Sequence, residues 1–352
     1  MKSDKSRLFL HLDIEKNKNA GHKAVNDCER IMRQMGYGQI QIRKSQNRNQ
    51  IIRNIQNTIQ LVKLLFVKKN IELIVQHPMH INWGYMLVLK YMKRLRKTRL
   101  IFIVHDFEIL RELLTDKGSI RKDWILLEIA DFLLVHNDRM KKYFMEEQGV
   151  SENKLYTLGI FDYLMDDEMS EKKSNRNEKT QKEIVIAGNL SKEKSSYIYE
   201  MDRVCSGGVK INLYGLGFEE NSGLKSCAYK GAYEADILPN VLEGEYGLVW
   251  DGPVVTACAG NTGNYMRYNN PHKVSLYIAA ELPVIIWKQA ALADFVIKNQ
   301  IGIAIDSLEE IEKELKKISD VQYTIFKENL KKLSLKVRKG EYLKKALQSI
   351  QI

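Results

Sequence analysis

The sequence has few cysteines and does not group them. Cys28, Cys205, Cys227 and Cys258 are scattered through 352 residues, with no Cys-x-x-Cys pair and no histidine at zinc spacing. This pattern argues against a disulfide-rich secreted domain and against a zinc module. It favours buried thiols in a reducing compartment, and we expect no metal site.

The sequence also lacks an apolar run long enough to cross a membrane. The longest candidate, residues 59–67, is interrupted by Lys63, whereas a spanning helix needs about 20 apolar residues. Residues 8–14 form a short run that contains His11 and Asp13, which favours a strand over a signal peptide. We therefore predict a cytoplasmic protein.

Several catalytic signatures are absent as well. The sequence has no Gly-x-x-x-x-Gly-Lys-Ser/Thr loop, no His-Glu-x-x-His and no Gly-x-Ser-x-Gly elbow. These absences argue against a P-loop nucleotidase, a zinc protease and an ordinary esterase. No Asp-x-Asp follows an expected strand, so a departing diphosphate would be neutralised by lysine and helix N-termini in place of Mg²⁺.

Acidic residues are too few to balance the basic ones. The chain has 55 lysines and arginines against 44 acidic residues, a formal charge of +11. This charge suits an anionic partner, which leaves nucleic acid, the inner leaflet of a membrane and a phosphorylated small molecule open. The densest basic run, residues 90–99, is equally typical of a solvated helix end and of a membrane-surface patch.

Apolar strand patterns alternate with helical patterns in both halves of the chain, which predicts an α/β fold of two doubly wound, Rossmann-like domains facing across a cleft. We expect strands at 8–12, 40–42, 71–75, 100–104, 132–135, 184–187, 211–214, 246–250, 283–287 and 302–305. Expected helices are 22–35, 50–69, 82–96, 124–130, 139–147, 191–205, 234–242, 271–280, 292–298 and 308–318. The predicted domains are 1–165 and 184–320, with a polar linker at 166–183 and helices at 321–352 that pack back over them.

The most informative run follows the expected strand 246–250. A loop of roughly twenty residues ends in Asn269-Asn270-Pro271-His272-Lys273. Asn270 is suited to capping the next helix and Pro271 to its first position, which puts Lys273 in the first turn, where the helix dipole disfavours a cation. A bound anion would remove that conflict, so we predict a phosphate site, with a plain capped helix as the alternative.

Other candidates also follow expected strands. In the second half they are Gly188, Asn189 and Lys192 after one strand and Tyr214 and Gly215 after the next, although the third glycine of a dinucleotide fingerprint is missing. In the first half, Asn19 and Gly21 open a helix and suit a turn that reaches a ligand, or a solvated turn. His105 and Asp106 suit general-base chemistry, or structural capping.

At these residues the sequence resembles a bacterial glycosyltransferase family of the two-domain GT-B architecture. That family contains galactofuranosyltransferases of cell-surface polysaccharides and a glucosyltransferase that extends glycans on serine-rich adhesins. The matching stretches are residues 19–21, 105–106, 188–192, 246–250 and 268–286, and the last is the most specific. Glu281 stands where such a sequence would have glycine, which leaves open whether it touches the donor or ends the helix.

The resemblance implies metal-independent transfer of a hexosyl group from a UDP-sugar, bound mainly by the second domain, to a glycan acceptor bound mainly by the first. It implies no cofactor besides the donor and no nucleic acid. A lipid-linked acceptor, contact with the inner membrane surface and a homo-oligomer stay open. The donor-binding residues would be Asn19, Gly21, Gly188, Asn189, Lys192, Tyr214, Gly215, Tyr268, Asn269, Asn270, His272 and Lys273. Asp106 is the first candidate base and His105 the second. The alternatives are a glucosyltransferase acting on protein-linked N-acetylglucosamine and a non-catalytic glycan-binding subunit.

Overall fold

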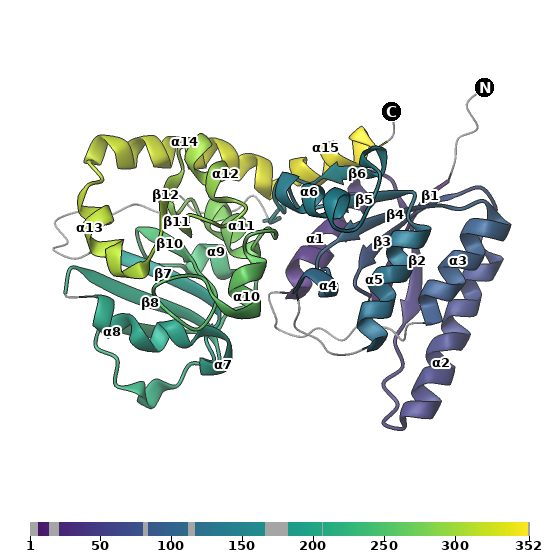
Figure 1. Ribbon diagram of the computed structural model, residues 1–352, viewed down its shortest axis with the longest axis horizontal. Helices are drawn as coiled ribbons and strands as arrows, with labels where there is room; N and C mark the ends of the chain where they lie inside the picture. The colour runs from purple at the N-terminus through teal and green to yellow at the C-terminus, as the bar shows by residue number, and fades with distance from the viewer. Residues whose placement is uncertain are drawn as a thin grey trace. The chain divides into compact units, whose positions relative to one another are not determined.

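The computed structural model describes residues 6–13, 21–79, 84–111, 117–165, 182–205 and 207–350. Within these ranges the chain forms two compact units, each built around one parallel sheet (Figure 1). Unit 1 comprises the described residues of 6–13, 25–159 and 343–350, and unit 2 those of 21–24 and 160–342. Of the expected linker, 166–181 lie outside the described residues, and Lys182 and Glu183 already belong to the first strand of unit 2.

Unit 1 has six strands in the order β2-β1-β3-β4-β5-β6, all paired in parallel. Nearly every residue of the two central strands, β3 and β4, is buried, as expected for a sheet covered on both faces. The strands are β1 (Arg7–Asp13), β2 (Gly38–Arg43), β3 (Glu72–His77), β4 (Arg99–Val104), β5 (Phe132–Val135) and β6 (Leu155–Thr157). The helices are α1 (Gly21–Gln34), α2 (Gln50–Val62), η1 (Lys63–Phe66), α3 (Gly84–Arg96), α4 (Glu108–Arg111), α5 (Lys117–Ile129), α6 (Asp138–Glu146) and η2 (Glu152–Lys154).

Unit 2 has a second parallel sheet, in the order β12-β11-β10-β7-β8-β9. The strands are β7 (Lys182–Asn189), β8 (Val209–Leu216), β9 (Cys227–Gly231), β10 (Tyr246–Val249), β11 (Val284–Trp287) and β12 (Gly302–Ile305). The helices are α7 (Lys192–Ser195), η3 (Ser196–Glu200), α8 (Met201–Val204), η4 (Glu220–Ser222), α9 (Leu238–Val241), α10 (Gly260–Tyr265), α11 (His272–Ala279), α12 (Ala293–Lys298), η5 (Leu308–Glu310), α13 (Ile311–Lys316) and α14 (Asp320–Arg338).

The C-terminal helices divide between the units. The long helix α14 packs against α11 in unit 2, and its buried residues include Phe326, Leu330 and Val337. Most of α15 (Glu341–Ser349) groups with unit 1, where Arg99 donates to the carbonyl of Ile350 over 3.3 Å. Each unit is thus completed by a segment from the end of the chain.

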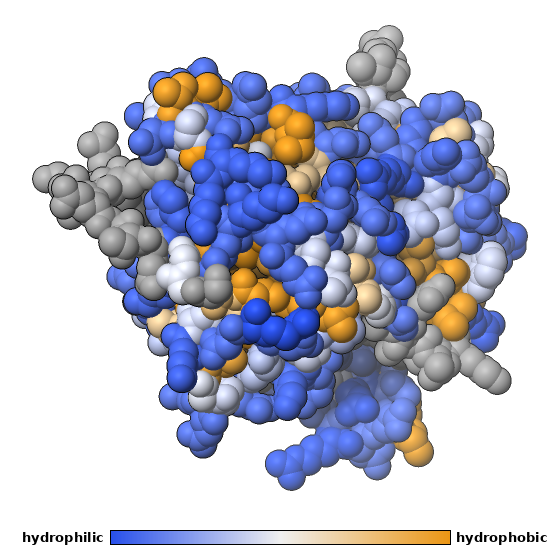
Figure 2. All heavy atoms as spheres, turned by 60° about the vertical axis from the view of Figure 1, so that its left-hand side comes forward, coloured by the Kyte–Doolittle hydropathy of each residue, from blue (hydrophilic) through white to orange (hydrophobic). Residues whose placement is uncertain are grey.

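The surface of the described residues is mostly polar on the face that Figure 2 shows, where hydrophobic residues form small separate patches. Within the described ranges, no helix combines the length and the apolar character that a membrane crossing requires. The same ranges contain no group of three or more His, Cys, Asp or Glu side chains arranged to hold a metal ion.

Candidate functional site

The strand order of unit 2 reverses between β7 and β10. These strands are neighbours, yet β8 and β9 follow β7 in the chain and lie on its other side. Ligands of doubly wound sheets bind at such a switch point, outside the carboxyl ends of the strands. Here those ends carry Gly188 and Asn189 on β7 and Trp250 just after β10.

Helix α11 is fixed against this point by the hydroxyl of Tyr277. The oxygen accepts a hydrogen bond from the Ala187 amide at 3.0 Å and lies 3.3 Å from the Val185 carbonyl and 3.2 Å from the Leu248 carbonyl. The ring lies against Gly247, where an added Cβ would come within 2.3 Å of it. A single side chain therefore joins α11 to both strands of the switch point.

Lys273, in the first turn of α11, reaches the switch point. Its Nζ donates to the Trp250 carbonyl over 3.0 Å, and its Cε lies 3.3 Å from where a Cβ on Gly188 would stand. Burial lowers the pKa of Lys273, an effect that the carboxylate of Asp251 opposes. Among the described residues Lys273 makes no ion pair, so an anionic ligand would add a direct counter-charge where Asp251 acts only from a distance.

The N-terminus of α11 differs from the expected one. The expectation that Asn270 is the N-cap residue is wrong, because the N-cap residue is Pro271, whose side chain makes no capping hydrogen bond. The N-cap residue itself therefore supplies no side-chain acceptor to the first amides of α11. Asn270 is buried and Tyr268 is half-buried, while the buried side-chain oxygen of Asn269 has no hydrogen-bond partner. Such an oxygen suits a donor group on a ligand.

Gly188 and Gly215 bring the ends of β7 and β8 into close backbone contact. Gly215 has φ +144°, and a Cβ on it would lie 1.8 Å from the Gly188 oxygen. Glycine is required here for space as well as for backbone conformation. Tyr214 is buried and accepts a hydrogen bond from the Glu243 amide. Asn189 accepts from the Ser191 amide, and the exposed Lys192 lies over the Tyr199 ring at 5.9 Å.

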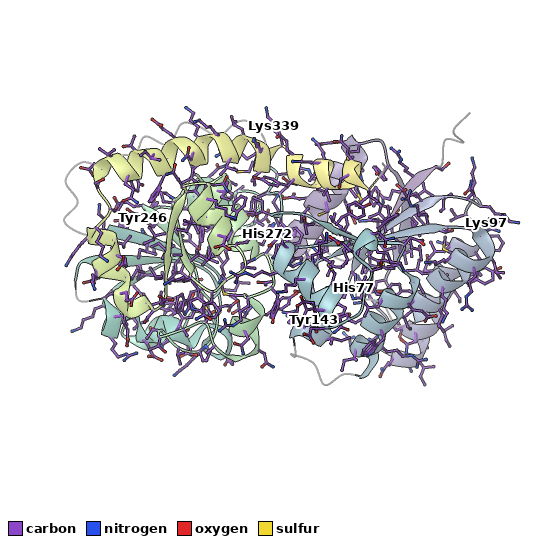
Figure 3. The ribbon with its side chains drawn as sticks, turned by 45° about the horizontal axis from the view of Figure 1, so that its top comes forward. His77, Lys97, Tyr143, Tyr246, His272 and Lys339 are labelled. Carbon is purple, nitrogen blue, oxygen red and sulfur yellow. The ribbon has the colours of Figure 1, made fainter. Side chains whose placement is uncertain are left out.

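His272 lies at the start of α11 (Figure 3), next to residues that follow the end of unit 1 in the chain. Its ring stacks on Tyr163 with centroids 5.0 Å apart, and its Nε2 donates to the Asp162 carbonyl over 3.3 Å. Burial lowers the pKa of His272 to about 4, so the ring is neutral near pH 7. The cation that the sequence predicts for a diphosphate is thus Lys273 and not its neighbour.

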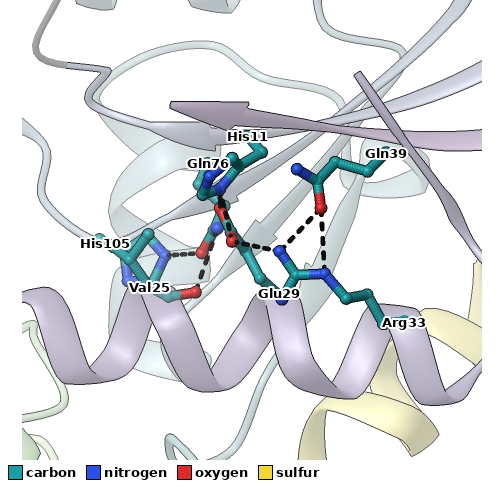
Figure 4. A network of polar contacts seen from close by, with 7 residues as sticks. All are labelled: His11, Val25, Glu29, Arg33, Gln39, Gln76 and His105. Atoms are coloured by element: carbon teal, nitrogen blue, oxygen red, sulfur yellow. Dashed lines mark hydrogen bonds and ion pairs between the residues drawn. The ribbon is translucent and has the colours of Figure 1, made fainter. Parts of the chain in front are cut away.

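In unit 1, His105 and Asp106 directly follow β4. His105 shares a hydrogen bond of 2.7 Å with Gln76, whose amide donates to the Val25 carbonyl of α1 (Figure 4). Asp106 pairs with Arg111 at 3.1 Å. Both groups therefore lie at the carboxyl end of the sheet, where a ligand is expected in this architecture.

A buried pair of side chains, His77 and Asp123, lies near this edge of the sheet. His77, labelled in Figure 3, contacts Asp123 at 2.7 Å, and the second oxygen of Asp123 accepts from the Ile109 amide at 2.9 Å. Glu108 is buried beside Arg111, and burial raises the pKa of its carboxyl. Sequence reasoning did not single out His77 or Asp123, because nothing local shows that they meet.

The remaining predicted residues are less informative. Asn19 lies outside the described residues, and Gly21 begins α1. The structure brings together Lys273, Gly188 and Gly215 at the switch point. It also supplies residues that the sequence analysis missed, namely Tyr277 and the Trp250 carbonyl. The only signal for Tyr277 in the sequence is that it is the one tyrosine of an apolar helix and that a neighbouring strand contains a glycine, Gly247.

His136, which follows β5, has a lowered pKa, from which the pH dependence of stability can be predicted. Burial lowers its pKa to about 4, against about 6.5 in the unfolded chain. Between these values the unfolded state binds more protons, so stability rises with pH. We expect the free energy of unfolding to be about 2 kcal/mol lower at pH 5 than at pH 7 on this account. Urea unfolding at pH 5 and pH 7 measures this difference in the free energy of unfolding. If the difference is just as large in His136→Asn, His136 is not its source.

Glu281 ends α11 in the left-handed conformation, with φ +56°. Its carboxylate accepts from Ser334 at 3.0 Å and Arg338 at 3.2 Å on α14, and it lies at the end of α11 opposite Lys273. The residue at the position where the resemblance leads one to expect glycine therefore ends the helix and ties it to α14.

We expect Glu281→Ala to lower the free energy of unfolding by about 1.5 kcal/mol, because both contacts are lost. Glu281→Gly should be about 1 kcal/mol more stable than the alanine variant, because glycine adopts φ +56° without strain. Urea unfolding of the three proteins measures both effects. A glycine variant less stable than the alanine variant would refute this account.

Comparisons with known proteins agree with this architecture. The N-terminal and C-terminal domain families of glucosyltransferase 3-like proteins match residues 10–160 and 184–350. The beta-1,6-galactofuranosyltransferase WbbI of Escherichia coli K12 is 34% identical over 265 residues, 75% of this chain and 74% of WbbI. Glucosyltransferase 3 of Streptococcus gordonii is 28% identical over 133 residues, 37% of this chain and 38% of that protein.

Solved structures share the fold. Sucrose-phosphate synthase from Thermosynechococcus elongatus has a TM-score of 0.62 at 10% identity and covers 98% of both chains. The pneumococcal O-GlcNAc transferase GtfA, solved with UDP and GlcNAc, has a TM-score of 0.52 at 15% identity, over 84% of this chain and 59% of GtfA. The two parallel sheets and these glycosyltransferase neighbours confirm the predicted GT-B fold class. With both domain families matched and the predicted resemblance confirmed, the chain belongs to the glucosyltransferase 3-like family and is a glycosyltransferase.

Proposed function

We propose that this glycosyltransferase transfers a hexosyl group from a UDP-sugar to a glycan acceptor in the synthesis of a bacterial cell-surface polysaccharide, without a metal ion. The observation that carries the proposal is the position of Lys273 at the switch point of unit 2, beside the glycine backbone of β7. A galactofuranosyl donor is favoured by the likeness to WbbI, which extends over three quarters of the chain.

The donor's diphosphate would lie against the first turn of α11. The first amides of α11, the positive end of the helix dipole and the ammonium of Lys273 all favour an anion there. Gly188 and Gly215 would let the nucleotide approach the backbone. Asn269 would direct its buried oxygen to a donor group of the ligand. The other predicted contacts, from Asn189, Tyr214 and Asn270 among others, remain proposals of the same kind.

In the reaction, the bond between the sugar's anomeric carbon and the diphosphate oxygen breaks while an acceptor hydroxyl oxygen bonds to that carbon. The departing UDP gains negative charge, which Lys273 and the α11 amides would stabilise. An inverting reaction also needs a base for the acceptor's proton. We propose Asp106 for that role and His105 as the second candidate.

Turnover with a panel of UDP-sugars and glycan acceptors tests the proposal, in the presence and absence of EDTA. We expect transfer from UDP-galactofuranose that EDTA does not change. Transfer of glucose to protein-linked N-acetylglucosamine would instead establish the alternative enzyme. A non-catalytic glycan-binding subunit would show no transfer and no release of UDP, and loss of turnover in EDTA would contradict metal independence.

Asp106→Asn tests the base. We expect kcat to fall by about 10² to 10⁴, the usual contribution of general-base catalysis, with UDP affinity unchanged. His105→Gln is the comparison, because glutamine can keep a hydrogen bond to Gln76. If His105→Gln alone abolishes turnover, the base is His105. Full activity in both variants would show that neither residue acts as a base.

A further inference from the structure

Helix α2 presents its apolar side to solvent. The apolar residues on this side of α2 are between 40% and 71% exposed, and Phe66, just beyond it in η1, is 82% exposed. With 100° of rotation per helical residue, the five exposed apolar residues of α2 fall within an arc of about 100° around the helix axis. They are Ile51, Ile52, Ile55, Ile59 and Val62. On the opposite side Asn57 is buried, and its oxygen accepts from the Ser45 amide at 2.7 Å. A helix that only covered a core would have the reverse pattern.

The neighbouring helix α3 carries a second exposed stripe. It packs beside α2 and η1 in unit 1 (Figure 1). Leu87, Tyr91 and Leu95 recur every four residues and are 46%, 42% and 61% exposed, whereas Met86 and Leu89 face the core. We call the exposed apolar residues of α2, η1 and α3, together with the basic residues around them, the α2–α3 surface.

The basic excess of the sequence is concentrated in the segment that contains this surface, although Lys90 and Lys93 of α3 pair with Glu128 and Asp131 outside it. Residues 30–105 contain fifteen lysines and arginines and a single acidic residue, Glu72, a formal charge of +14. Glu72 is buried and pairs with Arg99 at 3.3 Å. Since the chain as a whole carries +11, the remainder has a net charge of −3. Exposed cations adjoin both stripes in the chain, among them Arg48, Lys69 and Lys97, the last labelled in Figure 3.

Exposed aliphatic residues set among cations suit the interface of an anionic lipid bilayer. Apolar side chains enter the boundary of the acyl chains while lysine and arginine meet the headgroup phosphates. A second copy of the chain would bring two strongly positive surfaces together, and nucleic acid would leave the isoleucines exposed to water. A hollow of about 520 Å³ adjoins α2, lined by Arg43, Lys44, Asn47, Gln56 and Ile59 among others, and is suited to a headgroup.

We propose that the α2–α3 surface docks the protein on an anionic phospholipid bilayer. This inference goes beyond the proposed function, because it rests on residues of unit 1 that the donor site does not use. If the acceptor is lipid-linked, docking would bring the enzyme to the surface where that acceptor is held.

Flotation of the full chain with vesicles tests the proposal. Vesicles of equal parts phosphatidylglycerol and phosphatidylcholine are compared with vesicles of phosphatidylcholine alone. We expect binding to the anionic vesicles that added salt weakens without abolishing. A triple variant, Ile51→Ser with Ile55→Ser and Ile59→Ser, should lose at least tenfold in affinity, as should Arg48→Gln with Lys68→Gln and Lys69→Gln.

The matched control changes three exposed apolar residues of α14, by Val321→Ser with Ile325→Ser and Leu335→Ser. It should bind vesicles like the wild type, and thermal unfolding should show that every variant is folded. Three results would overturn the proposal. The wild type could bind neutral vesicles as well as anionic ones or bind neither, or the triple serine variant of α2 could bind anionic vesicles as well as the wild type. If the wild type is a dimer and the triple serine variant of α2 is a monomer, the surface serves self-association instead. If the protein binds nucleic acid and the triple serine variant binds it equally well, the surface acts through its charge alone.

Discussion

Lys273→Ala is expected to lower the affinity for UDP at least about 100-fold, which corresponds to about 2.7 kcal/mol. The ammonium would donate charge-assisted hydrogen bonds to the diphosphate, and each such bond contributes about 1.5 to 3 kcal/mol. Isothermal titration calorimetry with UDP measures the loss directly. The effect should appear in the dissociation constant whether or not an acceptor is present.

Two further variants show whether the loss is specific. Lys288→Ala removes an exposed lysine that pairs with Asp306 at 2.9 Å, and it should bind UDP like the wild type. Lys273→Ala itself should remain folded, because it removes a cation whose only described hydrogen bond goes to one carbonyl. UDP binding of undiminished strength in a folded Lys273→Ala protein would show that the diphosphate site is elsewhere.

Gly215→Ala should have the largest effect on stability. The new Cβ would overlap the Gly188 carbonyl oxygen, 1.8 Å away, and alanine would be strained at φ +144°. Strain of this kind alone is of order 1 to 3 kcal/mol, and relief of the overlap would force β7 and β8 apart. We expect the free energy of unfolding to fall by at least about 3 kcal/mol, measured by urea denaturation, together with loss of UDP binding.

Gly223→Ala is the matched control in the same unit. Gly223 also has a positive φ, of +71°, but a Cβ there would have no atom within 4 Å. Only the conformational cost remains, about 1 kcal/mol. Similar losses in the two variants would mean that contact between β7 and β8 is not what requires glycine at position 215.

The central strands of both sheets could be predicted from the sequence because they are short apolar runs between turn residues. β6 and β9 were missed, because both are edge strands: β6 has three residues and β9 has no fully buried one. The expected helix 191–205 is three short pieces, α7, η3 and α8. Periodicity could not show those breaks, which follow from packing against the rest of unit 2.

The expected loop between β10 and α11 contains helix α10, whose sequence Gly-Asn-Thr-Gly-Asn-Tyr has little helix propensity. The loop folds closely on itself here, since a Cβ on Gly263 would lie 2.5 Å from the backbone of Cys258 and 3.1 Å from the Asp251 oxygen. The position of Lys273 in a first helical turn was predictable from local pattern. Its contact with the Trp250 carbonyl was not, because that contact depends on the order of the strands.

The hydroxyl of Tyr277 has a further consequence. Because it is held by backbone groups of β7 and β10 at once, α11 cannot slide or rotate over the sheet without breaking buried hydrogen bonds. The end of the helix that carries Lys273 is therefore set in place when unit 2 folds. A nucleotide arriving there would meet a preorganised anion site, and little of its binding free energy would be spent on ordering the protein.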